Sequence, residues 1–192
     1  MVMVRKLYVF DFDDTLVSSG ALVVVTHKDG SVEKLLSHEF ATYVPLSGDE
    51  FDFSEFDRYP PNGKIINNMF TKMLSAIKEV GHENVVVLSA RGNSSVMREF
   101  LNDNGLSHDI EIVGVGTSDP KAKGSYVRQK VLKGNYTEVY VFDDSRANVQ
   151  AMERAVKKHP GIEFFGTVVA TQQESMLRKT IRGIIKELFR CP

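Results

Sequence analysis

The sequence predicts an α/β fold in which a parallel sheet is doubly wound by helices. Short apolar runs of strand character alternate with segments of helical periodicity, which is the pattern of βαβ units. Three of the apolar runs end in charged or hydroxyl side chains. The chain has 192 residues, enough for one domain with a sizeable core. We therefore expect a single domain over 1–192, with right-handed crossovers between its strands.

Five apolar runs rich in Val, Ile, Phe and Tyr are predicted to form the strands of this sheet. Their apolar character is nearly continuous, as is typical of strands that are buried on both faces. The predicted strands cover residues 6–11, 84–89, 110–115, 137–143 and 163–169.

Helical spacing separates these runs. Apolar residues recur from Ile66 to Val80 with a period near 3.6 and predict a helix that Gly81 ends. Side chains that cap helix N-termini predict the starts of three more helices. They are Asn93, Asp119 with Pro120 in the first helical position, and Ser145.

The stretch 17–63 departs from this alternation. Residues 21–26 and 31–36 flank Asp29-Gly30, a strong signal for a β-hairpin. Residues 47–57 then interleave five acidic residues with three phenylalanines. We interpret the stretch as an insertion after the first strand, with its phenylalanines packed on the sheet and its acids forming a solvated face.

Polar side chains follow three of the predicted strands, at the point where each strand ends. Because the carboxyl ends of parallel strands share one edge of the sheet, these side chains should converge on one crevice. A buried carboxylate must be compensated by a cation or by hydrogen-bond donors, and magnesium is a cation that prefers oxygen ligands. An Arg guanidinium can donate two parallel hydrogen bonds to a phosphate. The alternative at the first strand is a turn capped by Asp, with help from Thr15. The converging side chains are Asp11 with Asp13, Ser89 with Arg91, and Asp143 with Asp144.

Two lysines are candidates for this crevice. Lys121 and Lys123 both lie in the first turn of the helix that Pro120 begins. A lysine there opposes the helix dipole, so an anion should compensate at least one of them. Arg91 has two interpretations, because it could bind a substrate phosphate or hold the loop after its strand.

In chain order, four sequence motifs resemble the signature motifs of the haloacid dehalogenase (HAD) superfamily. They are the run Asp11 to Thr15, Leu88 to Arg91, a downstream lysine, and Phe142 to Asp144. The resemblance implies a Rossmann-like core in which 17–63 is a β-hairpin flap or small cap. It makes Asp11 the nucleophile that forms an aspartyl-phosphate and Asp13 the general acid and base, and it favours Lys123 over Lys121 as the catalytic lysine. The resemblance also implies substrate-phosphate binding by Phe12, Thr15, Ser89, Ala90 and Arg91, and Mg2+ binding by Asp11, Asp13, Asp143 and Asp144.

Because it has Asp13, the chain resembles the phosphate-handling branch of that superfamily. This resemblance implies a magnesium-dependent phosphomonoester hydrolase. The insertion and residues 116–123 also resemble small stand-alone HAD hydrolases of bacteriophages. A more distant resemblance is to the phosphatase domain of polynucleotide kinase-phosphatases. Three alternatives stay open: a phosphatase of nucleic-acid ends, a phosphotransferase, and a non-catalytic binding protein with this fold. The expected partner is therefore a phosphorylated small molecule or nucleic-acid end.

The composition of the chain bears on its partners, its disulfides and its location in the cell. The chain is 42% hydrophobic and 26% charged, with a formal net charge of −1, so no overall attraction to nucleic acid is expected. Cys191 is the sole cysteine, which excludes an intramolecular disulfide. The apolar start is broken at Arg5 and Lys6, and no apolar run approaches ~18 residues, so we expect a cytoplasmic protein without a membrane span.

The segment 174–190 is predicted to be an amphipathic helix with Ile181 on its inward face. It carries five basic and two acidic residues. The helix could pack on the sheet or on a second subunit, or its basic side chains could contact a nucleic-acid backbone. The oligomeric state stays open.

Overall fold

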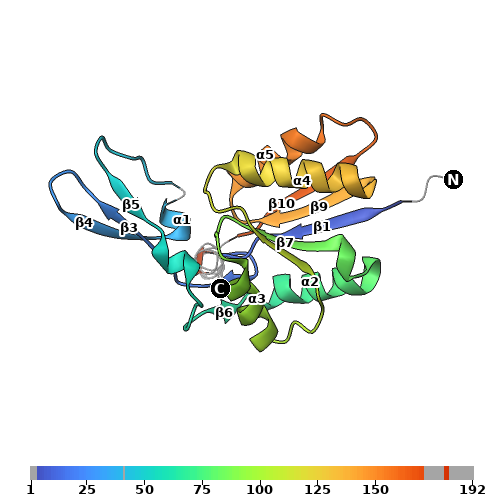
Figure 1. Cartoon of the computed structure of the whole chain (residues 1–192), viewed down its shortest axis with the longest axis horizontal. Helices are drawn as coiled ribbons and strands as arrows, with labels where there is room; N and C mark the ends of the chain where they lie inside the picture. Colours follow the sequence, from blue (N-terminus) through green and yellow to red (C-terminus); the bar gives the residue numbers. More distant parts are fainter. Residues whose placement is uncertain (1–3, 41, 171–179, 182–192) are drawn as a thin grey trace, which may run out of the picture.

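A five-stranded parallel sheet forms the centre of the fold (Figure 1). The computed structural model describes residues 4–40, 42–170 and 180–181. The strands lie in the order β10-β9-β1-β7-β8, and every neighbouring pair is parallel. All five strands predicted from the sequence are confirmed. They are β1 (Lys6–Phe10), β7 (Val85–Ser89), β8 (Glu111–Gly114), β9 (Glu138–Asp143) and β10 (Glu163–Val168).

Helices cover both faces of the sheet. On one side lie α2 (Asn67–Val80) and α3 (Ser94–Asp103), and on the other lie α4 (Pro120–Gly134) and α5 (Arg146–Val156) (Figure 1). A short 3-10 helix, η2 (His82–Asn84), leads into β7. The predicted N-caps are confirmed, because their side chains accept hydrogen bonds from backbone N–H groups of the first turn. These caps are Asn93, Asp119 and Ser145.

Alternate side chains of the strands build two apolar layers, as the period of two in a β-strand requires. Tyr8 and Phe10 of β1 belong to the core under α2 and α3, whereas Leu7 and Val9 belong to the core under α4 and α5. Leu7 and Phe10 are completely buried. Each such side chain contributes about 1.5–3 kcal/mol to stability, so β1 is firmly fixed and its carboxyl end is a rigid platform.

The chain reverses its direction across the sheet at β1. It adds β7 and β8 on one side of β1 and then β9 and β10 on the other. Such a topological switch point leaves a crevice at the carboxyl ends of the two strands that flank it, here β1 and β9. The fold therefore places the residues that follow β1 and β9 beside a ready-made ligand crevice.

The insertion 17–63 forms a small sheet of its own. Its strands lie in the antiparallel order β4-β3-β5, and the predicted hairpin is confirmed by the pairing of β3 with β4. In Figure 1 this sheet extends to the left of the core. The elements are β3 (Leu22–Thr26), β4 (Val32–Leu36), α1 (Ser37–Phe40), β5 (Glu50–Asp52) and the 3-10 helix η1 (Ser54–Asp57), and β2 (Val17–Ser18) pairs with β6 (Lys64–Ile65) at the base.

The phenylalanines of the insertion do not pack on the central sheet as predicted. Phe51 and Phe56 pack instead against a small core centred on Val23 and Val25 of β3. The reason is that the insertion forms three strands, which gives it an apolar face to bury within itself.

The predicted basic helix 174–190 lies outside the described residues, apart from Thr180 and Ile181. Both are helical, and the Ile181 side chain is 45% exposed. None of the helices in the described ranges has the length and apolar character that a membrane crossing demands.

Candidate functional site

Three buried side chains meet at the carboxyl end of the sheet. The Lys123 ammonium donates hydrogen bonds to Asp11 Oδ1 at 2.6 Å and to Asp143 Oδ2 at 2.8 Å. All three residues are at most 6% exposed. Lys121, the other predicted candidate, is exposed. The crevice lysine is therefore Lys123, and the strand ends of β1 and β9 converge as predicted.

Close packing of two helices brings Lys123 to this position. Gly124 follows it in α4, and a Cβ atom at Gly124 would lie only 2.9 Å from the carbonyl oxygen of Ala151 in α5. Because glycine has no side chain, the first turn of α4 can approach α5 closely. The Lys123 side chain then points into the crevice instead of into solvent.

Asp143 is held from both sides. One carboxylate oxygen binds Lys123, and the other accepts hydrogen bonds from the Ser145 backbone N–H at 2.9 Å and from Asn148 Nδ2 at 3.1 Å. Sequence reasoning missed Asn148. Its position in the first turn of the helix capped by Ser145, five residues after Asp143, is a signal that could have identified it.

Three carboxylates form a group that could hold a metal ion. Oxygen atoms of Asp11, Asp143 and Asp144 all lie within 4.8 Å of one another. Burial raises the pKa of Asp144 to about 7, with help from the charges of Asp143 and Asp14. Burial also raises the pKa of Asp11 well above its usual value, although Lys123 opposes the shift.

The charge balance of this group suits a divalent cation. Burial acts to lower the pKa of Lys123, but Asp11 and Asp143 outweigh it and raise that pKa above its usual value, so the lysine stays charged. Three carboxylates then face a single ammonium. Hard oxygen donors with surplus negative charge are the ligands that magnesium or calcium prefer. Asp13, predicted as a fourth metal ligand, is not part of this group.

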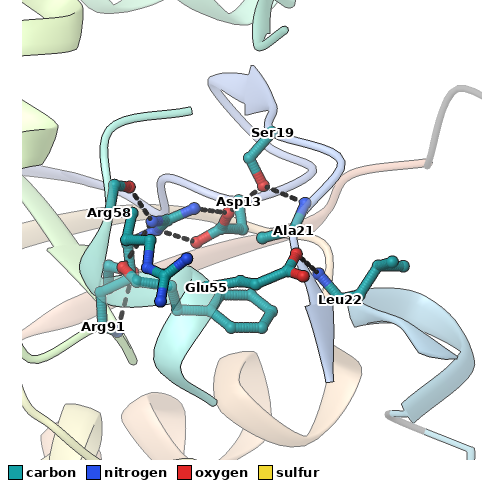
Figure 2. Close-up of polar contacts among 9 residues, drawn as sticks. Asp13, Ser19, Ala21, Leu22, Glu55, Arg58 and Arg91 are labelled. Atoms are coloured by element: carbon teal, nitrogen blue, oxygen red, sulfur yellow. Dashed lines mark hydrogen bonds and ion pairs between the residues drawn. The ribbon is translucent and has the colours of Figure 1, made fainter. Parts of the chain in front are cut away.

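Asp13 forms a two-point ion pair with Arg91 (Figure 2). Arg91 Nε donates to Asp13 Oδ2 at 2.8 Å, and Arg91 Nη2 donates to Asp13 Oδ1 at 2.7 Å. Ser19 Oγ adds a hydrogen bond of 2.6 Å to Asp13 Oδ1. Both ion-pair partners are at most 7% exposed. Planar, bidentate pairing of this kind fixes the orientation of a carboxylate as well as its position.

The same arginine connects Asp13 to the insertion. Its Nη1 donates to the carbonyl oxygens of Phe56 and Arg58 at 2.5 and 3.4 Å. The guanidinium also lies over the rings of Phe12 and Phe56, with its Cζ atom 5.1 and 5.2 Å from the ring centroids. Arg91 was predicted to bind the substrate phosphate or to hold its loop. In the structure its guanidinium holds Asp13 and η1.

A cavity of about 610 Å3 contains much of this machinery. Asp11, Asp13 and Lys123 line it together with Ser89, Ala90 and Arg91 from the end of β7. A volume of this size can accept a small organic ligand. The structure therefore brings together most of the predicted catalytic and phosphate-binding residues at one opening.

Two predicted phosphate-binding residues have side chains elsewhere. The Phe12 ring is completely buried and packs edge-to-face on Phe100, with centroids 6.1 Å apart. Thr15 is completely buried as well, and its hydroxyl has no hydrogen-bond partner among the described residues. Neither lines the cavity.

The fold is similar to that of a solved bacterial protein. The crystal structure of the Legionella pneumophila effector Ceg4 matches 95% of this chain and 95% of its own, with a TM-score of 0.52 and 15% sequence identity. A likeness at this identity concerns the fold alone. No protein-family model matches the chain, and no curated protein matches it either.

Proposed function

We propose that this chain is a magnesium-dependent phosphomonoester hydrolase of the HAD type, acting through an aspartyl-phosphate on Asp11. One observation carries the proposal. Asp11, which follows the central strand, shares a buried lysine with Asp143 and lines the same cavity as Asp13 and Ser89. Phosphoryl transfer needs such positioning and charge compensation more than any other help from the protein.

In the first step, a carboxylate oxygen of Asp11 attacks phosphorus while the bond from phosphorus to the leaving oxygen breaks. As the proposed general acid, Asp13 gives a proton to that oxygen, and the alcohol departs. Lys123 stays bound to Asp11 and compensates the negative charge that gathers around phosphorus. A magnesium ion held by Asp11, Asp143 and Asp144 would supply further charge compensation.

In the second step, water attacks phosphorus of the aspartyl-phosphate and gives a proton to Asp13. The bond from phosphorus to the Asp11 oxygen breaks, so inorganic phosphate leaves and both carboxyl groups return to their starting states. Ser89 would hold a phosphoryl oxygen in both steps. In this proposal the insertion is the flap of the site, since Arg91 joins its η1 segment to Asp13.

Phosphate release from phenyl phosphate is expected to require Mg2+ and to stop when the ion is chelated. Saturating Mg2+ should also raise the melting temperature by about 5 °C or more, because it binds the folded carboxylate group and not the unfolded chain. Asp144→Asn removes one ligand and should abolish most of that shift. Calorimetry with and without chelator measures it.

The matched control for the metal experiment is Asp109→Asn, since the Asp109 side chain is 93% exposed and lies outside the carboxylate group. This control should keep the full Mg2+ shift. The metal site would be refuted if both variants lost the Mg2+-dependent rise in melting temperature equally, or if phosphate release continued when Mg2+ is chelated.

Arg91→Lys is expected to slow alkyl phosphates more than aryl phosphates with good leaving groups. Lysine cannot reproduce the two-point contact with Asp13, so proton donation to the leaving oxygen loses its alignment. An alkoxide needs that proton and p-nitrophenolate does not. We expect kcat/KM to fall about 100-fold for an alkyl phosphate and much less for p-nitrophenyl phosphate. Equal losses for both substrates would show that Arg91 has only a structural role and does not align Asp13 for proton donation.

A further inference from the structure

The cavity has a second wall, which the proposed chemistry does not use. This wall is lined by side chains of the insertion. Besides Ser37 and Asp57 these are all apolar: Val23, Phe40, Phe53 and Phe56. A ligand whose phosphate lies at Asp11 therefore has its remaining atoms within reach of an aromatic surface.

Among the rings of this wall, Phe40 and Phe56 also pack against the small core of the insertion, whereas Phe53 is exposed. Phe53 lies edge-to-face on Phe40, with centroids 5.3 Å apart at an interplanar angle of 83°, and its centroid is 6.4 Å from that of Phe56. Even so, Phe53 is 39% exposed. Aromatic rings take further rings in edge-to-face or offset contacts. An exposed apolar surface inside a polar site is typical of a ligand-binding groove.

The charges around the cavity argue against a polyanionic leaving group. The two basic residues among its described lining residues, Lys123 and Arg91, are both bound to carboxylates. Asp57, which the proposed chemistry does not use, adds a further negative charge to the lining. A second phosphate would meet this charge, whereas a neutral ring would meet apolar surface.

We infer that the substrate is a phosphomonoester with a neutral, aromatic leaving group, whose ring packs against Phe53 and Phe40 while its phosphate lies at Asp11. This inference rests on the proposed function and specifies its substrate class. It favours a small aromatic ester over a phosphorylated nucleic-acid end, because the nucleic acid carries further phosphates beside the one removed.

The test compares kcat/KM for benzyl phosphate, ethyl phosphate and a phosphorylated oligonucleotide, each with Mg2+. Benzyl and ethyl phosphate both release a primary alcohol and both need the proton from Asp13, so they differ mainly in the ring. We expect benzyl phosphate to exceed ethyl phosphate by about tenfold or more. Phe53→Ala should reduce that ratio toward one. The control is Phe165→Ala in β10, because Phe165 is 42% exposed and does not line the cavity, so the ratio should be kept.

Inhibition of the unaltered protein gives a second measurement, which does not depend on a variant that folds. Benzylphosphonate should inhibit with a constant about tenfold lower than that of ethylphosphonate. Equal rates for the benzyl and ethyl esters, or faster turnover of the oligonucleotide, overturn this inference and leave the hydrolase proposal standing. Turnover of none of the esters overturns the proposed function and this inference with it.

Discussion

Asp11→Asn is expected to abolish phosphate release, with a loss of about 10^4-fold or more in kcat. An amide oxygen is a poor nucleophile toward phosphorus, so no aspartyl-phosphate can form. The fold should persist, because asparagine has the same shape and its oxygen can still accept the hydrogen bond from Lys123. Steady-state assays with phenyl phosphate measure the loss, and circular dichroism checks the fold.

The matched control for that variant is again Asp109→Asn, because the Asp109 side chain is 93% exposed and lies outside the carboxylate group. Activity near that of the unaltered protein is expected there. Turnover by Asp11→Asn above a few per cent of the original rate would contradict the assignment of the nucleophile.

Lys123→Met is expected to give the largest loss of stability of any single change at the site. Methionine fills a similar volume but leaves the Asp11 and Asp143 carboxylates buried without their cation. Removing one partner of a buried ion pair costs about 3–5 kcal/mol of unfolding free energy. Urea denaturation in the presence of a chelator measures this loss. Activity should disappear as well.

Two comparisons test whether the loss of stability in Lys123→Met comes from the missing positive charge. Lys121→Met changes an exposed lysine two residues earlier in the same helix turn, and it should alter stability by less than about 0.5 kcal/mol. Mg2+ should restore part of the stability that Lys123→Met loses, because it replaces the missing positive charge. Similar losses in both variants would show that Lys123 has no special role.

The parts of the fold that are local in sequence could be predicted from it. The strands, the N-caps at Asn93, Asp119 and Ser145, and the hairpin turn at Asp29-Gly30 each depend on neighbouring residues. Convergence at the carboxyl edge of the sheet then followed from the topology of parallel strands alone.

The remaining features depend on contacts that no local pattern encodes. Asp13 and Arg91 are 78 residues apart. The sequence explains each of them separately, as a catalytic acid and as a phosphate or loop contact, so it contains no signal that they pair with each other. The packing of Phe51 and Phe56 within the insertion depended on how many strands formed there. The resemblance favoured Lys123 over Lys121, but the local pattern left both open, because the choice depends on the direction of a side chain, which the approach of Gly124 to α5 determines.

Detection of the phosphoryl group on Asp11 is the most direct test of the central proposal. Protein quenched in acid during turnover of phenyl phosphate with Mg2+ would be examined by intact-mass and peptide mass spectrometry. We expect one added phosphoryl group, mapped to the peptide that contains Asp11 and missing from Asp11→Asn. Continued turnover with the phosphoryl group on another residue, or activity that persists in Asp11→Asn, would contradict it.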